Sequence, residues 1–293
     1  MAAGQPGVGT GDPEGDPRVS KPKQPSVTQR QTVKALADTS GVPLDDVDRA
    51  IVLGQIAEFL AMSPKVGGRV AFKGGAIMTL VEFSPRLSRD LDSSLVVHTG
   101  RRVTLEEVEA ALTSPEARRI VRRVDRKGVT FGSSQLRIPV IICHPKSGVG
   151  DVQVAFSVNW SEPILLEPVL EDVTIDGHKV KLRVMARPER VAEKVRTYLN
   201  RGEARDVFDL YIYSSRWMTA ANWGQLADLI AKKLLADPRA PQGARARVVF
   251  DENTAARSAG WDTDKNPLRL SKAKIPAWKD VEPVLQKYRS RLP

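Results

Sequence analysis

The chain has 293 residues, 41% hydrophobic and 27% charged, which excludes a mostly disordered or fibrous protein and allows a core without disulfides. The single cysteine, Cys143, excludes an intramolecular disulfide and a multi-cysteine zinc site, and the three scattered histidines lack metal-ligand spacing. Lysine and arginine number 45 against 35 acidic residues, and the resulting net charge of +10 favours a polyanionic partner such as nucleic acid.

The first part of the chain alternates between predicted helices and strands after a disordered leader. Residues 1–26 hold five Gly, five Pro and almost no large apolar side chains, so they cannot offset the entropy cost of ordering. The elements that follow are, in chain order, helix 27–37, helix 43–62, strand 69–72, helix 76–83, strand 91–97, charge-rich helical segments across 104–125, a hairpin over 129–143 interrupted by Pro139, strand 151–160 and strand 172–185.

The remainder of the chain is predicted to be mostly helical. Its periodic segments are 188–200, 204–216, 222–236 and 277–290. Residues 237–276 are rich in Pro, Arg and Asp and show only weak periodicity, so no helix is predicted there. The chain is therefore predicted to be α+β, with a mixed α/β domain over 27–186 and a helical, basic domain over 187–293.

The apolar runs are too short for a membrane protein. The longest, such as 138–143, fall far short of the roughly 20 residues that span a bilayer. The N-terminus lacks the apolar core of a signal peptide. We therefore expect a cytoplasmic protein with no membrane segment.

The most informative stretch is residues 70–92, where a strand meets a Gly74-Gly75 turn, a helix and a second strand. Glycines let an anion approach the backbone, and a helix N-terminus offers free N–H groups. Asp90 and Asp92 are two apart on the second strand, so both carboxylates project to one face. A divalent cation relieves their mutual repulsion, and Mg²⁺, which prefers oxygen ligands and substrate phosphates, fits best. Each feature alone is common in loops and at strand ends, whereas their order is much more specific.

Two blocks of the sequence resemble a known family. Phe-Lys-Gly-Gly at 72–75 and Arg-x-Ser-Arg-Asp-Leu-Asp at 86–92 resemble the signature of the AbiEii/AbiGii nucleotidyltransferase toxins. That family includes the MenT-like mycobacterial toxins and belongs to the polymerase β-like nucleotidyltransferase superfamily. The second block, Glu193-Lys194 followed by RGEARDVFDL at 201–210, is similar to the family's Glu-Lys and Arg-Asp-x-x-Asp-Leu segments. Together the blocks lie within residues 70–210.

The resemblance implies a fold and an activity. The fold would be a polymerase β-like core with a mixed sheet, followed by a mainly helical C-terminal domain that contributes to the active site. The activity would be Mg²⁺-dependent transfer of a nucleoside monophosphate from an NTP. In related toxins the acceptor is the 3′ end of tRNA, whose extension blocks aminoacylation and growth. A cognate antitoxin would be a further partner.

The resemblance also implies roles for the residues of the first block. Lys73, Gly74 and Gly75 would bind the triphosphate, and Asp90 and Asp92 would hold Mg²⁺ as metal ligands and catalytic residues. Many superfamily members carry Ser or Thr directly after the glycines. Here Ala76 follows, which removes a hydroxyl able to touch a phosphate.

The second block, together with Ser88 of the first, would complete the site. Lys194 would pair with the phosphates as a point charge. Asp206 and Asp209 lie three apart on one helix face, and one of them would bind metal or orient Lys194 or the acceptor. Ser88 would contact the nucleotide or merely begin the strand. Arg205 would bind phosphate or pair with an acid one turn away.

A third carboxylate, which superfamily members often carry on a neighbouring central strand, is in doubt. The corresponding face of 151–160 offers Gln153, Ala155 and Ser157, with Asp151 only at the strand's start. This departure puts more weight on Asp206 and Asp209.

Two alternatives to a tRNA-modifying toxin stay open. One is a nucleotidyltransferase that acts on a protein or small-molecule acceptor, against which the basic surplus argues. The other is a non-catalytic RNA-binding module on the same fold. Both Asp90 and Asp92 argue against it, because RNA binding gains nothing from two adjacent negative charges.

Overall fold

The computed structural model describes residues 44–96, 101–144, 151–175, 177–263, 268 and 275–293. Its strands form one mixed sheet in the order β3-β5-β6-β2-β1-β8-β7, with β4 paired to β5. The strands are β1 (Val70–Lys73), β2 (Asp90–Leu95), β3 (Val121–Asp125), β4 (Thr130–Phe131), β5 (Gln135–Cys143), β6 (Val152–Asn159), β7 (Val169–Ile175) and β8 (His178–Val184). The β2–β6 and β1–β8 pairs are parallel, and the other pairs are antiparallel.

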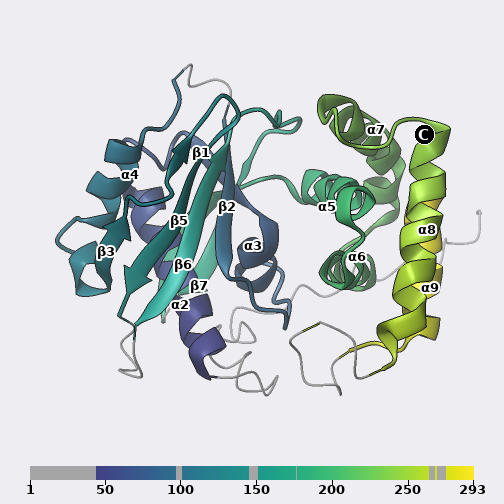
Figure 1. Cartoon of the computed structure of the whole chain (residues 1–293), viewed down its shortest axis with the longest axis horizontal. Helices are drawn as coiled ribbons and strands as arrows, with labels where there is room; N and C mark the ends of the chain where they lie inside the picture. Colours follow the sequence, from purple (N-terminus) through teal and green to yellow (C-terminus); the bar gives the residue numbers. More distant parts are fainter. Residues whose placement is uncertain (1–43, 97–100, 145–150, 176, 264–267, 269–274) are drawn as a thin grey trace, which may run out of the picture.

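Helices flank the sheet and then form a second layer of the molecule. They are α2 (Leu44–Met62), α3 (Gly74–Leu80), α4 (Leu105–Leu112), a short 3₁₀ helix at Ala117–Arg119, α5 (Arg187–Arg201), α6 (Ala204–Arg216), α7 (Ala220–Ala236), α8 (Ala244–Trp261) and α9 (Trp278–Arg289). In Figure 1, α5 to α9 gather beside the sheet, and α3 lies on the side of the sheet that faces them. None of the helices in the described part of the chain has the length and apolarity that a membrane span requires.

The side chains of β6 alternate between the two faces of the sheet, so one face is buried in the core and the other can carry functional side chains. Val152, Val154, Phe156 and Val158 are buried in the core that α2 covers, as predicted from the sequence. The intervening residues, with Ser157 among them, therefore lie on the opposite face. The site is built on that face.

The described residues form two hydrophobic clusters. One joins α2, α4 and the sheet, and the other joins α5 to α9 around Tyr198, Phe208, Phe250 and Tyr288. α5 packs against α6, α7 and α8. The domain boundary between residues 186 and 187 stays a prediction; it falls between the end of β8 and the start of α5.

Most predicted elements are confirmed, and two are wrong. Residues 121–125 are the strand β3, not helix, because they pair with β5 at the sheet edge. Residues 244–261 form α8, although their weak periodicity predicted no helix; α8 buries only a few side chains, such as Phe250 and Trp261.

Other predictions need adjustment or lie outside the described residues. The strand predicted over 172–185 is the hairpin β7–β8, which turns at Gly177 in the left-handed region with φ +85°. Pro139 interrupts β5 as predicted, since the register with β6 shifts between Ile138 and Ile141. The leader 1–26 and the helix 27–37 lie outside the described residues.

Candidate active site

The glycine turn lies directly against the functional side chains of the first block. Gly74 has a φ of +76°, a left-handed conformation that glycine tolerates best. A Cβ on Gly74 would stand 2.7 Å from Asp92 Oδ2, and a Cβ on Gly75 would stand 2.7 Å from Arg86 Nη2 and 2.8 Å from Ser88 Oγ. The turn therefore needs two glycines for close approach, and it places their backbone next to a carboxylate and a guanidinium.

Asp90 and Asp92 share one face of β2, as predicted, because the intervening Leu91 is buried in the core. Ser157 Oγ donates a hydrogen bond of 2.8 Å to Asp92 Oδ1. Partial burial raises the pKa of Asp90, and the negative charge of Asp92 raises it further. The Asp92 carboxylate therefore lies close enough to oppose the ionisation of Asp90, which is the condition that a bound cation relieves.

The donor set fits a hard divalent cation. Asp90 and Asp92 supply carboxylate oxygens, and the glycine turn leaves space that a Cβ would fill. Among the described residues, no group of three or more His, Cys, Asp or Glu side chains is placed to hold a metal. A cation at Asp90 and Asp92 would thus need further oxygens from substrate, which is how Mg²⁺ is commonly bound with phosphates.

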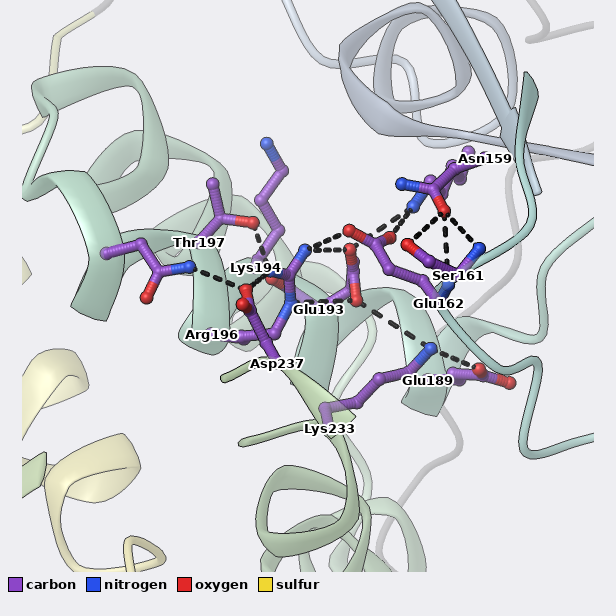
Figure 2. Close-up of polar contacts among 12 residues, drawn as sticks. Asn159, Ser161, Glu162, Glu189, Glu193, Lys194, Arg196, Thr197, Lys233 and Asp237 are labelled. Atoms are coloured by element: carbon purple, nitrogen blue, oxygen red, sulfur yellow. Dashed lines mark hydrogen bonds and ion pairs between the residues drawn. The ribbon is translucent and has the colours of Figure 1, made fainter. Parts of the chain in front are cut away.

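Lys73, the last residue of β1, is held by acidic partners. Its amine forms ion pairs with Glu162 and, at 3.3 Å, with Glu193. Burial would lower the pKa of Lys73, but the carboxylates of Glu193 and Glu162 outweigh it and raise that pKa. Figure 2 shows that Glu162 and Glu193 also pair with Arg196. Because Lys73 pairs with the same two carboxylates, it is charged and lies at the edge of a larger network of ion pairs.

Lys194 is held by two buried carboxylates. Its Nζ lies 2.6 Å from Asp209 Oδ2 and 3.4 Å from Asp206 Oδ1. Arg86 donates two hydrogen bonds to Asp209, of 2.8 and 2.9 Å, and Arg201 donates two to Asp206, of 2.7 and 2.8 Å. Burial would raise the pKa of Asp209, but Arg86 and Lys194 hold it below its ordinary range. Both carboxylates are 0% exposed, so this geometry lets them orient cations rather than reach a metal.

A cleft of about 320 Å³ collects most of the candidate residues. It is lined by Lys73, Gly74, Gly75, Ser88, Asp90, Asp92, Lys194 and Arg205, but not by Asp206 or Asp209. Ser88 Oγ lies 3.1 Å from the carbonyl oxygen of Asp90, to which it donates, and Arg205 pairs with Glu203 at 2.5 Å. Ser88 thus bonds to the first residue of β2, and Arg205 pairs with an acid two residues before it, while both side chains also line the cleft.

Sequence reasoning assigned no role to several lining residues. Arg86 and Arg201 line the cleft and belong to the two sequence blocks that carry the family resemblance. Their positions in these blocks could have marked them as candidate site residues. Strand alternation placed Ser157 on the correct face of β6, but only the register with β2 sets it against Asp92. Arg196 had no local signal, because the packing of α5 brings it to the cleft.

Several solved structures share this fold, among them the following three. MenT4, a nucleotidyltransferase toxin from Mycobacterium tuberculosis, matches with 18% identity and a TM-score of 0.58, covering 88% of each chain. JHP933 from Helicobacter pylori matches with 14% identity and a TM-score of 0.53, covering 85% of this chain and 93% of that one. A putative nucleotidyltransferase from H. pylori matches with 15% identity and a TM-score of 0.51, covering 83% and 92%.

The fold is that of a polymerase β-like nucleotidyltransferase of the α+β class. The family model described as "Nucleotidyl transferase AbiEii toxin, Type IV TA system" matches residues 59–284, which is most of the chain. The chain therefore belongs to the AbiEii family of nucleotidyltransferase toxins, and the resemblance seen in its sequence is confirmed. No curated protein sequence matches the chain. The family's type implies a nucleotide substrate and an antitoxin partner.

Proposed function

We propose that this toxin transfers a nucleoside monophosphate from an Mg²⁺-bound NTP to the 3′ end of tRNA, which blocks aminoacylation and growth. The observation that carries the proposal is one cleft that unites the glycine turn, the Asp90–Asp92 pair and the Lys194 amine. Phosphoryl-type transfer depends on positioning and charge neutralisation, and these groups supply both. Both proposed substrates are cytoplasmic, so the proposal places the protein in the cytoplasm.

The chain's own residues would divide the work. The Gly74-Gly75 backbone admits the triphosphate, and Lys194, oriented by Asp206 and Asp209, neutralises phosphate charge. Asp90 and Asp92 would hold Mg²⁺, which when bound supplies charge stabilisation and lowers the pKa of the attacking hydroxyl. The acceptor oxygen forms a bond to the α-phosphorus, the bond to the β-phosphate oxygen breaks, and pyrophosphate leaves. The hydroxyl proton passes to the carboxylate pair.

The charge of the protein supports a nucleic-acid acceptor. The net charge is +10, and more than half of this surplus lies in residues 228–293. A concentration of lysine and arginine suits a surface that follows a phosphate backbone. A small-molecule acceptor would gain little from it.

Labelled NTPs test the proposal directly. Incubating the protein with each of the four labelled NTPs, Mg²⁺ and total RNA is expected to label a tRNA-sized band. Chelation of Mg²⁺ with EDTA is expected to abolish the label without changing the thermal midpoint of unfolding. Label on protein alone would contradict the RNA acceptor, and RNA binding without pyrophosphate release would contradict catalysis.

A further inference from the structure

A row of four polar residues crosses the sheet beneath the site. Lys73 is in register with Asp92, Asp92 with Ser157, and Ser157 with Arg137, so the row runs across β1, β2, β6 and β5. Residues in register lie on the same sheet face. The row therefore has Lys73, next to the glycine turn, at one end, Asp92 and Ser157 in its middle, and Arg137 at the other end.

A second hollow, of about 220 Å³, lies at the Arg137 end of this row. It is lined by Asp90, Asp92, Gln135, Arg137, Ala155 and Ser157. The larger cleft shares Asp90, Asp92, Gln135 and Ser157 with it, so the two spaces meet at the carboxylate pair. The carboxylates thus border the cleft that holds the glycine turn and the hollow toward β5. A further hollow of about 490 Å³ reaches Asp90 from the side of Arg86 and Arg205.

The Arg137 guanidinium is available for a ligand. Arg137 is exposed, and no residue in the described part of the chain forms an ion pair with it. Burial and the charge of Asp92 raise the pKa of Asp90, and the positive charge of Arg137 partly offsets this rise. Ala155 and Ser157 add no negative charge to this side, so nothing within the hollow except the carboxylate pair repels an anion.

The chemistry decides which anion belongs there, and this step rests on the proposed function. In phosphoryl transfer the attacking and leaving oxygens are roughly in line. Pyrophosphate leaves on the side of Gly74, Gly75 and Lys194, so the acceptor hydroxyl enters from the opposite side, above β6 and β5. The hollow with Arg137 lies on that side.

We infer that Arg137 binds the last phosphodiester of the acceptor RNA strand and so sets the 3′-terminal ribose at the carboxylate pair. A guanidinium recognises phosphate through charge-assisted hydrogen bonds, often two at once. A protein or small-molecule acceptor without a phosphodiester has no use for this contact.

Binding of an unreactive RNA tests the inference without turnover. The probe is a short single-stranded RNA with a 3′-deoxy end, made with a normal last linkage or with an uncharged methylphosphonate there. Wild-type protein is expected to bind the methylphosphonate RNA about tenfold more weakly, because one charge-assisted contact is lost. Arg137→Ala is expected to bind both RNAs equally weakly, and Arg137→Lys is expected to recover part of the difference.

Salt dependence and a matched charge change provide the controls. Arg137→Ala is expected to reduce the slope of log K against log salt by roughly 0.7, the loss of one phosphate contact to a single strand. Lys181→Ala removes an equal charge from β8, where Lys181 pairs with Asp172 at 3.1 Å, and is expected to bind both RNAs like wild type. If Arg137→Ala distinguishes the two RNAs as wild type does, the inference is wrong.

Transfer to the same RNA with a 3′-hydroxyl end separates this failure from that of the proposed function. If wild-type protein labels neither this RNA nor tRNA, the proposed function is wrong. If wild type and Arg137→Ala both label the RNA with the same KM for RNA, only the assignment of Arg137 is wrong. The expected result is a KM for RNA about tenfold higher in Arg137→Ala.

Discussion

Gly74 and Asp92 form one structural unit, because the Cα of the glycine lies against the carboxylate of the aspartate. A Cβ on Gly74 would stand 2.7 Å from Asp92 Oδ2 and 3.1 Å from Asp92 Cβ. The φ of +76° at Gly74 is a second, independent reason for glycine at this position. The turn that would cradle the triphosphate therefore packs directly against the carboxylate that would hold its metal.

Gly74→Ala is expected to damage both stability and activity. The left-handed backbone costs an alanine about 1–2 kcal/mol in free energy of unfolding. The new methyl group also displaces the Asp92 carboxylate, so we expect transfer to fall at least about 100-fold, a loss of roughly 2.7 kcal/mol in transition-state stabilisation. Urea denaturation and the rate of label transfer measure the two effects.

Gly68→Ala is the matched control for this change. A Cβ on Gly68 would meet no atom within 4 Å, and its φ is not left-handed. We expect its free energy of unfolding to stay within about 0.5 kcal/mol of wild type, with full activity. Equal behaviour of the two variants would show that the close approach at Gly74 is unimportant.

Asp92→Asn is expected to abolish transfer and leave the fold intact. The change removes a proposed metal ligand, so transfer should fall at least about 100-fold. It also removes the charge that helps to raise the pKa of Asp90, so that pKa should move down toward its ordinary value, as NMR titration would measure. The thermal midpoint should hold or rise, because like charges no longer face each other. Asp125→Asn, on the edge strand β3, should retain activity; an active Asp92→Asn variant would rule out the metal assignment.

Substitutions of Lys194 and Asp209 are expected to affect transfer activity and the free energy of unfolding to different extents. Asp209→Asn leaves two buried cations short of a partner and should cost about 3 kcal/mol in free energy of unfolding. Lys194→Met should cost less, because Arg86 still neutralises Asp209 and Arg201 still neutralises Asp206. Transfer should nonetheless fall at least about 100-fold in Lys194→Met, a barrier increase near 2.7 kcal/mol. Full activity in that variant would reduce Lys194 to a purely structural residue.

Glu193 is expected to make stability depend on pH. Burial would raise the pKa of Glu193, but Lys73, Arg196 and Lys233 hold it well below its ordinary range. Such a group stabilises the fold above its unfolded-state pKa of about 4.3, and this contribution is lost as pH falls through the lower folded-state pKa. The difference in free energy of unfolding between wild type and Glu193→Gln should therefore be largest near neutral pH and shrink below about pH 4. A difference that is constant with pH would contradict this account.

Local chemistry explains which parts of the site could be predicted. The turn at Gly74 and the pair Asp90 and Asp92 lie within one strand–turn–helix–strand unit, where spacing alone fixes which side chains share a face. Contacts between distant segments could not be predicted. The hydrogen bond from Ser157 to Asp92 joins residues 65 apart, and the bonds from Arg86 to Asp209 join residues 123 apart.

The same distinction explains the errors in secondary structure. Residues 121–125 carry a charge-rich pattern that favours helix, but the unpaired edge of β5 offers hydrogen bonds that only the folded sheet reveals. Residues 244–261 show little amphipathic pattern because α8 is mostly exposed and touches the helical core through a few side chains, such as Phe250. Tertiary packing overrode the local signal in both segments.

Short-range spacing and residue type predicted the α+β class and the residues of the glycine turn and of the paired acids, and the resemblance of two sequence blocks predicted the family. The tertiary structure decided that Asp206 and Asp209 hold Lys194, Arg86 and Arg201, with neither carboxylate exposed to the cleft. Burial depends on the packing of the whole chain. When α5 packs against α6, the carboxylates of Asp206 and Asp209 lose contact with water and therefore need cationic partners.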